Sequence, residues 1–274
     1  MGWKSGSGMS LIEVIVAVAV LGLVTVALLQ LFLTSNVFTA VAGHEVASAN
    51  LAQEILEEIK SVPWNQIGTA RGGTADTILL DPAAGSEKGK YIGYTIALTL
   101  VDKNTGERVA GQVRQVVEYN GGDTTAGDTT AVVSLPWDEV PDCTAFNVRY
   151  VLFPWPVSGK AQGGTSNTIV LDSSLSQEDG YYKGYLIAIT GGRGTGQWRR
   201  VVSSTGSTVT VDPPWNDVPD ATSEYRMVRE TCPYRVLEKG MSASGDLITF
   251  EVTVTYRDRG QQREVSLTTD KLRR

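Results

Sequence analysis

One carboxylate at the front of a long apolar segment is the feature of this sequence best placed to do chemistry. Glu13 follows a short polar leader that ends at Gly8, and an almost unbroken apolar run extends from there to Leu33. A charged side chain close to hydrocarbon costs free energy, so such residues are rare and usually have a partner. The position of Glu13 therefore indicates a partner charge.

The residues around Glu13 resemble the signal of type IV prepilins. The leader carries one cation, Lys4, and Gly8 and Met9 precede the glutamate. In that family a membrane-embedded peptidase cuts after the glycine, and the new N-terminal amine is methylated. The resemblance places the cut between Gly8 and Met9, with Met9 methylated. It also implies that Glu13 pairs with the N-terminal amine of a neighbouring subunit, which agrees with the strong attraction of opposite charges at low dielectric constant.

The sequence departs from the prepilin pattern at two places. Met9 stands where Phe is more common, and Gln30 lies where many main pilins have a proline, although Gly22 can still loosen the helix. A signal anchor and a cleaved secretory signal are the competing interpretations, because the apolar run is long enough for either. Neither explains Glu13, and the cleaved signal also lacks a small-x-small site after Leu33.

A glycine-rich stretch at residues 191–196 invites a nucleotide-loop interpretation. No Gly-Lys-Ser/Thr follows it, and residues 197–202 alternate like a strand instead of opening a helix. We therefore predict a β-hairpin turn.

The sequence gives little support for a metal site, a cofactor site or a catalytic site. Two groups of carboxylates are candidates for calcium, but their spacing lacks the ordered Asp-x-Asp-x-Asp-Gly pattern. The single histidine, His44, cannot complete a hydrolytic triad in an obvious way. We expect no metal site, no cofactor and no enzymatic activity. The carboxylates considered are Asp172, Glu178 and Asp179, and Asp123 and Asp128.

Two tryptophans and two cysteines are further candidates. Trp137 and Trp215 follow prolines and are either exposed stacking platforms for a surface or glycan ligand, or plugs at the end of a β-module. We favour the plug, since large aromatic side chains dominate small cores. Cys143 and Cys232 lie beyond the apolar run, where an exported body permits a disulfide; the sequence leaves both a bridge and two free thiols open.

The charge balance argues against a nucleic-acid partner. The 274 residues include 24 Lys and Arg against 30 Asp and Glu, a net charge of −6. Such a chain is not built to neutralise a phosphate backbone, so we predict no specific nucleic acid partner.

A continuous helix is predicted over residues 9–62. It contains good helix formers after the apolar run and ends where Pro63 disfavours helix at the residue before it. Its first half can span a bilayer, and its second half can pack one apolar face on a globular head. That face consists of Leu51, Ile55, Ile59 and Val62.

The C-terminus predicts a β-hairpin. Residues 248–256 alternate between apolar and polar, 257–260 form a turn, and 263–268 return as a second strand. This ending, together with the end of the helix, resembles PilV-type minor pilins and related pseudopilins.

An internal repeat lies between helix and hairpin. The second copy is shorter than the first, and the residues it lacks fall in turn-rich segments, as expected for duplicated β-modules. The second copy also resembles small repeat modules of phage tail-fibre and bacterial surface proteins. The matched segments are 77–81 with 168–172, 91–97 with 182–188, 111–114 with 196–199, and 136–142 with 214–220.

The sequence thus predicts an α+β fold, with a long helix and a β-rich pilin head into which two β-repeats are inserted. We expect the pilin core to fold without the repeats. The expected units are a leader (1–8), the helix (9–62), the pilin head (63–73 and 229–274), repeat one (74–151), a linker (152–164) and repeat two (165–228).

The resemblance implies a structural subunit, a minor pilin or pseudopilin of a type IV pilus, competence or type II secretion filament. Its partners would be other pilin subunits and prepilin peptidase. It would reside in the cytoplasmic membrane before assembly and then in an extracellular or periplasmic filament. The alternative is a membrane-anchored surface adhesin or carbohydrate-binding module.

Overall fold

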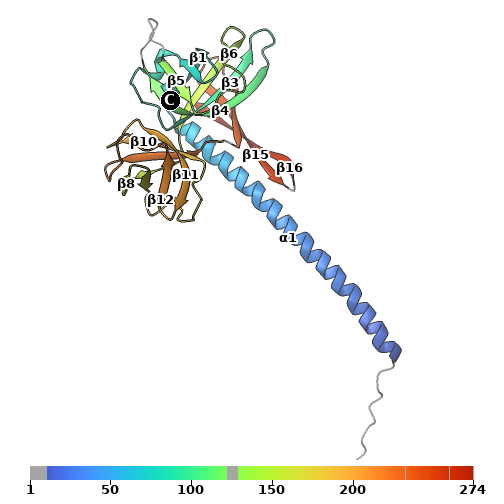
Figure 1. Cartoon of the computed structure of the whole chain (residues 1–274). Helices are drawn as coiled ribbons and strands as arrows, with labels where there is room; N and C mark the ends of the chain where they lie inside the picture. The colour runs from blue at the N-terminus through green and yellow to red at the C-terminus, as the bar shows by residue number, and fades with distance from the viewer. Residues whose placement is uncertain (1–10, 122–128, 232, 259, 274) are drawn as a thin grey trace, which may run out of the picture.

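A single long helix leads into a β-rich head (Figure 1). The computed structural model describes residues 11–121, 129–231, 233–258 and 260–273, and for residues 33–41 and 43 it describes the helical backbone alone. An N-terminal apolar helix followed by antiparallel sheets confirms the expected α+β class.

Helix α1 spans Leu11–Ser61, 51 residues without a proline. It ends where predicted, because Pro63 cannot continue the helix. The last helical hydrogen bond runs from the Val62 N–H to the Glu58 carbonyl at 3.2 Å. A short 3-10 helix, η1 (Trp64–Gln66), then turns the chain into the head.

Strands β1 to β6 form a closed antiparallel barrel in the order β1-β2-β5-β4-β3-β6, hereafter the first barrel. The expected boundary between residues 73 and 74 is wrong at this point. β1 was assigned to the pilin head, yet it pairs with β2 and β6 and closes the barrel. The elements are β1 (Ile67–Gly73), β2 (Thr77–Leu80), η2 (Pro82–Ala84), β3 (Tyr94–Asp102), β4 (Arg108–Asn120), β5 (Thr129–Val133) and β6 (Phe146–Pro154).

Strands β7 to β13 form the second module, ordered β7-β13-β10-β11-β12-β9-β8. Its edge strands β7 and β8 are consecutive in the chain and separated only by Ala161 and Gln162, so the sheet rolls until its edges meet. The expected linker at 152–164 is largely strand. Prolines and glycines there suggested a loop. Pro154, however, is the last residue of β6, and a proline is tolerated at the end of a strand. The strands are β7 (Val157–Lys160), β8 (Gly163–Thr165), β9 (Thr168–Val170), β10 (Tyr185–Gly191), β11 (Trp198–Thr205), β12 (Thr208–Asp212) and β13 (Glu224–Arg229).

The C-terminal sheet contains β14 (Tyr234–Met241), β15 (Leu247–Asp258) and β16 (Gln261–Leu272). β15 and β16 pair along their whole length, from Leu247 opposite Leu272 to Asp258 opposite Gln261. The predicted hairpin is confirmed, with longer strands and a shorter turn than the sequence indicated.

The first barrel and the second module share one set of strand pairings. β3 pairs with β4 and β6 as β10 pairs with β11 and β13, and β5 pairs with β2 and β4 as β12 pairs with β9 and β11. In the first barrel, β1 pairs with both β2 and β6. In the second module, β8 pairs with β9, which corresponds to β2, and β7 pairs with β13, which corresponds to β6.

One pair of glycines shows the parallel at atomic detail. A Cβ on Gly68 would lie 2.5 Å from the Tyr150 hydroxyl, and a Cβ on Gly159 would lie 2.6 Å from the Tyr225 hydroxyl. Each glycine therefore lets a tyrosine of the neighbouring strand lie across the backbone, a close approach that any side chain would block.

Three apolar clusters hold the head together. One fills the first barrel and includes Leu186, Ala188 and Val228 of the second module, and one fills the second module. The remaining cluster joins the end of α1 to the C-terminal sheet and to the outer face of the first barrel. The first barrel contributes Ile67, Ala97, Val113, Val151 and Phe153 to it.

Candidate functional site

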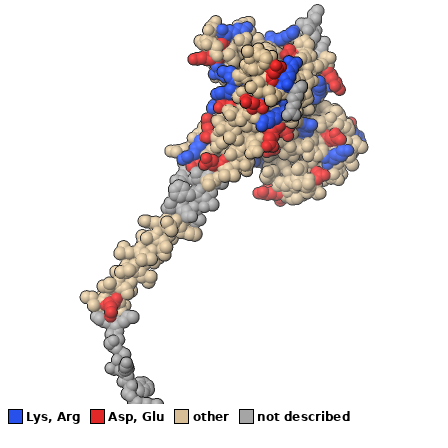
Figure 2. Space-filling model, turned by 180° about the vertical axis from the view of Figure 1, so that it is seen from behind, with Lys and Arg blue, Asp and Glu red and all other residues tan. Residues whose placement is uncertain are grey.

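The first half of α1 projects away from the head as an uncovered apolar rod. Leu11–Phe32 is 22 residues long with a mean hydropathy of 2.8, and none of it is buried. At about 1.5 Å per residue this segment is roughly 33 Å long, close to the 30 Å or so of a bilayer core. Figure 2 shows it as a surface free of charge except near its lower end, whereas acidic and basic side chains mix over the head.

Glu13 lies in the first turn of α1. A carboxylate there interacts favourably with the positive end of the helix dipole, which lowers part of the cost of its apolar surroundings. Gly8, Met9 and the leader 1–8 lie outside the described residues. The assigned roles of Gly8, Met9 and Glu13 stay predictions.

The second half of α1 is built into the head. The predicted apolar face is buried at Ile55, Ile59 and Val62, and Leu51 packs against the same cluster while partly exposed. Lys271 of β16 closes the helix end: its Nζ donates to the carbonyls of Lys60 and Val62, each at 2.6 Å. One continuous helix therefore joins an uncovered apolar segment rigidly to the head.

Trp137 and Trp215 do not form exposed platforms, because each is only 5 % exposed. Their indole N–H groups donate to the carbonyls of Thr77 (3.1 Å) and Thr168 (3.2 Å). The burial fits the plug interpretation and removes the surface-binding alternative for both.

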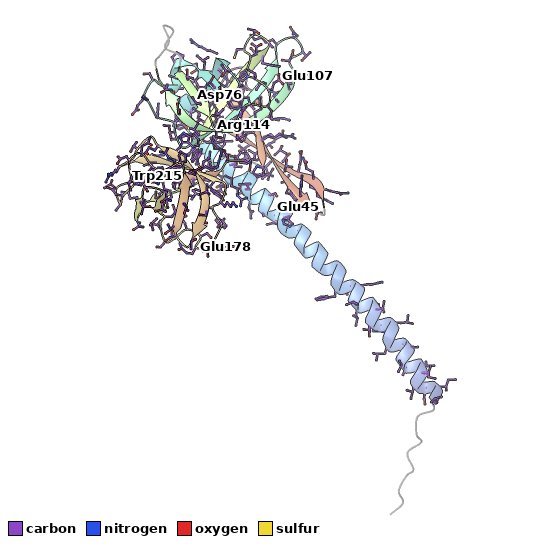
Figure 3. The ribbon with its side chains drawn as sticks, in the orientation of Figure 1. Glu45, Asp76, Glu107, Arg114, Glu178 and Trp215 are labelled. Carbon is purple, nitrogen blue, oxygen red and sulfur yellow. The ribbon has the colours of Figure 1, made fainter. Side chains whose placement is uncertain are left out.

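The guanidinium groups of Arg114 and Arg199 cover these indoles at 5.8 and 5.3 Å from the ring centroids, and Figure 3 locates Arg114 and Trp215. Each arginine also donates from Nε to a proline carbonyl, Pro136 for Arg114 and Pro214 for Arg199. The first barrel and the second module thus use the same arginine–tryptophan contact.

Cys143 is a half-buried free thiol, and Cys232 lies outside the described residues. The Cys143 thiol donates to the Ala70 carbonyl, with Sγ and O 3.3 Å apart, and burial raises its pKa. The bridge to Cys232 stays a prediction.

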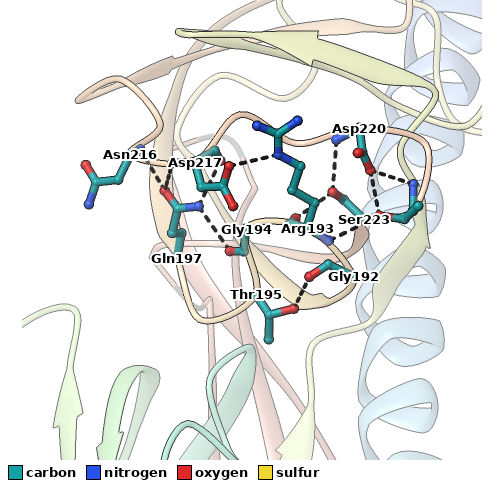
Figure 4. Close-up of polar contacts among 10 residues, drawn as sticks. Gly192, Arg193, Gly194, Thr195, Gln197, Asn216, Asp217, Asp220 and Ser223 are labelled. Carbon is teal, nitrogen blue, oxygen red and sulfur yellow. Dashed lines mark hydrogen bonds and ion pairs between the residues drawn. The ribbon is translucent and has the colours of Figure 1, made fainter.

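The glycine-rich stretch is a hairpin connection, as predicted. It joins β10 to β11, and the side chains around it close a polar network (Figure 4). Arg193 Nε donates to Asp217 at 2.8 Å. Gln197 Nε2 donates to the Gly194 carbonyl within the turn and to the Asp217 carbonyl in the connection between β12 and β13, and its Oε1 accepts the Asp217 N–H.

The calcium candidates serve turns where the structure describes them. The hydroxyl of Ser174 and then its N–H, which lies 2.9 Å from Asp172, lower the pKa of the Asp172 carboxyl, and Asp179 accepts the Gly206 N–H at 2.9 Å. Asp123 and Asp128 lie outside the described residues. Within the described ranges, no group of three or more His, Cys, Asp or Glu side chains is arranged to hold a metal ion.

Sequence reasoning missed two buried ionic contacts that fix the head. Besides Lys271, Glu238 of β14 is 8 % exposed and pairs with Arg149 of the first barrel at 3.1 Å. Both residues lie in strands that read as ordinary alternating segments, and their partners are 89 and 209 to 211 positions away. No local signal could have identified them.

Comparison with known proteins identifies the N-terminus alone. Residues 3–29 match the family model described as the prokaryotic N-terminal methylation motif. No curated protein and no solved structure matches the chain. The motif and the uncovered apolar helix indicate a type IV pilin-like prepilin, a structural chain that prepilin peptidase processes and that is anchored in a membrane before it joins other pilin subunits in a filament.

Proposed function

We propose that this chain is a minor pilin or pseudopilin of a type IV pilus, competence or type II secretion filament. The observation that carries the proposal is the division of α1 into two halves. Leu11–Phe32 is not buried by any described part of the chain, while one face of the second half, with Ala52, Ile55, Leu56 and Ile59, is buried against the head. A lipid bilayer covers the first half before assembly, and the helices of neighbouring subunits cover it afterwards.

In this proposal the peptidase cuts between Gly8 and Met9, and the amine of Met9 is methylated. Glu13 then meets the N-terminal amine of a neighbouring subunit within the helix bundle. Two opposite charges placed together in an apolar medium stabilise each other, whereas either one alone is costly there. This pairing favours insertion of a subunit in one register.

We also propose that the first barrel and the second module are two copies of one β-module carried by the head. Support comes from the shared strand pairings and from equivalent side-chain contacts. Gln112 exchanges two hydrogen bonds with the backbone of Glu139, and Gln197 does the same with Asp217. The proposed function for the whole is structural, with the modules displayed on the filament surface.

The test is expression of the full chain with prepilin peptidase and the other subunits of a filament. Gly8→Leu is expected to leave Met1 at the N-terminus, because a side chain there blocks the cut. Glu13→Leu is expected to be processed and inserted in the membrane but excluded from filaments. Glu45→Leu is the matched control, since Glu45 is an exposed carboxylate on the same helix beyond the apolar segment (Figure 3).

Mass spectrometry of the N-terminus and immunoblots of sheared filaments give the readouts. A chain that keeps Met1 in the presence of the peptidase would contradict processing. Equal filament content of Glu13→Leu and the parent would contradict the assembly role of Glu13. Retention of all chains in the membrane fraction would favour the membrane-anchored adhesin.

A further inference from the structure

A cleft of about 900 Å³ lies between the first barrel and the second module. Its walls come from the turn before β3 and the end of β4 on one side, and from β10, β11 and β13 on the other. Ligand sites typically measure about 300–1,000 Å³ and occur preferentially where two domains meet. The cleft has the size and the location of a binding site.

Two aromatic side chains form apolar parts of the cleft wall. Trp198 of β11 and Tyr94 of β3 both line the cleft, and both are half-buried and pack partly against the core of the first barrel. The guanidinium carbon of Arg226 lies 5.1 Å from the Tyr94 ring centroid, so this arginine bridges the modules. Partly exposed indole and phenol rings offer flat apolar faces with a polar rim.

The sister positions in the first barrel show that the module fold does not require these residues. Trp198 lies opposite Ala188 as Val113 lies opposite Ala97, and Arg226 lies opposite Ala188 as Val151 lies opposite Ala97. Val113 and Val151 are buried in the cluster that joins α1 to the C-terminal sheet. At the same two positions the second module carries a tryptophan and an arginine that line the cleft.

The charged groups of the cleft nearly balance, with one more basic than acidic side chain. The lining contains four basic and three acidic side chains, Lys88, Lys90, Arg199 and Arg226 against Glu87, Glu118 and Glu224. Two of the basic groups are committed to the protein, since Lys90 Nζ donates to the Ala84 carbonyl and Arg199 Nε to the Pro214 carbonyl. The cleft is therefore not built for a polyanion, which would need an excess of cations.

One uncharged polar group is held at the cleft edge by a rigid support. The Asn216 N–H donates to Gln197 Oε1 at 2.7 Å, and Gln197 Nε2 donates to the Gly194 and Asp217 carbonyls. Figure 4 shows the Asn216 carboxamide pointing away from this network, and the residue is exposed. Its side chain thus presents a donor and an acceptor to a ligand without loss of a structural contact.

We propose that this cleft binds an uncharged oligosaccharide. The Trp198 ring stacks on the apolar face of a sugar ring. The hydroxyl groups of the sugar form hydrogen bonds with the side chains of Asn216, Glu118 and Arg226. The combination of aromatic faces, amide and carboxylate groups and nearly balanced charge fits a ligand that has many hydroxyls and no net charge. This inference does not depend on filament assembly.

The experiment uses the full chain in detergent and isothermal titration with a panel of uncharged hexasaccharides from glucans, chitin, mannans and galactans. At least one member is expected to bind. Trp198→Val installs the residue of the sister position and is expected to weaken binding ~10-fold or more, as loss of a desolvated aromatic anchor does. Asn216→Ala, whose side chain supports no structural contact, is expected to weaken it several-fold.

Glu178→Gln is the matched control, an exposed carboxylate of the second module that does not line the cleft (Figure 3). It is expected to leave affinity unchanged. The proposal is overturned if no uncharged hexasaccharide binds, or if binding survives both Trp198→Val and Asn216→Ala. Tighter binding of a sulfated hexasaccharide that disappears with added salt would likewise overturn it in favour of an anion site.

Discussion

The head should still fold when the second module is deleted, but it should fail to fold when both modules are deleted. The cluster that joins α1 to the C-terminal sheet contains no residue between 157 and 228, but five of its members come from the first barrel, and four of these five lie between residues 74 and 228. Removing residues 158–226 therefore leaves that cluster complete, whereas removing 74–228 takes away Ala97, Val113, Val151 and Phe153. The expectation that the pilin core folds without both repeats is thus not supported by the packing.

The size of the effect follows from the buried side chains. Val113, Val151 and Phe153 are 6, 2 and 2 % exposed. Full burial of such side chains contributes about 1.5–3 kcal/mol each, so losing all three costs roughly 5–9 kcal/mol. A domain has only about 5–15 kcal/mol of stability in total. The larger deletion also removes Arg149 together with strands β3 and β4, which pack against β14, so the ion pair of Glu238 is lost and its carboxylate is uncovered.

The smaller deletion is geometrically simple. Val157 and Met227 are Cα partners across an antiparallel pair, so they lie about 5 Å apart and a short Gly/Ser bridge can join them. It uncovers the surface of the first barrel that Leu186 and Ala188 cover, at a cost on the order of 2–3 kcal/mol. We expect this variant to remain folded with a lower melting temperature.

The assay is urea unfolding followed by circular dichroism on chains that begin at His44, which keep every buried helix residue described. The 158–226 deletion should unfold cooperatively at lower urea concentration than the parent, and the 74–228 deletion should show no cooperative transition. A cooperative transition of the 74–228 deletion near that of the parent would refute the reasoning. So would an unfolded 158–226 deletion.

Two further predictions concern buried polar groups of the head. Lys271→Met keeps the aliphatic stem but removes the donor to the Lys60 and Val62 carbonyls; an unsatisfied buried acceptor costs about 1–3 kcal/mol, so the urea midpoint should fall, and an unchanged midpoint would contradict the role of these two hydrogen bonds. Burial and the nearby Asp81 carboxylate raise the pKa of Tyr150, so its folded form keeps the proton while unfolded tyrosine loses it above about pH 10. The stabilisation that comes from the raised pKa of Tyr150 is fully present below pH 10 and is lost as the pH rises. The difference in unfolding free energy between the parent and Tyr150→Phe should therefore shrink by up to about 1.4 kcal/mol per pH unit above pH 10. A difference that stays constant with pH in urea titrations would contradict this.

Local patterns explain what could be predicted from the sequence. The end of α1 follows from Pro63, the hairpin from strict alternation, and the buried tryptophans from aromatic dominance in small modules. The matched segments of the sequence include residues that make the same contacts in both modules, as Arg114 and Arg199 do over Trp137 and Trp215.

What was missed depends on contacts distant in the chain. β1 was separated from its barrel because Gly72 and Gly73 suggested a boundary, although they lie inside a strand that pairs with β2. The linker was misjudged because Gly159 resembles a flexible residue, yet it is there to admit the Tyr225 ring. The cleft could not be foreseen, since it forms only when two modules with unknown relative placement meet.

The way the modules stack suggests why a duplicated module leaves room for a ligand site. Each uses the same outer face for docking: Ala97, Val113, Val151 and Phe153 pack on the helix and C-terminal sheet, while Leu186, Ala188 and Val228 pack on the first barrel. Because the docking face of one module contacts a different face of the preceding module, a module can be added without disturbing the module before it. On the proposal that the modules are copies, the inner copy is constrained by the core around α1 and keeps apolar residues on this face. The outer copy has no helix to bury, so Trp198 and Arg226 are tolerated at the sister positions and can serve recognition.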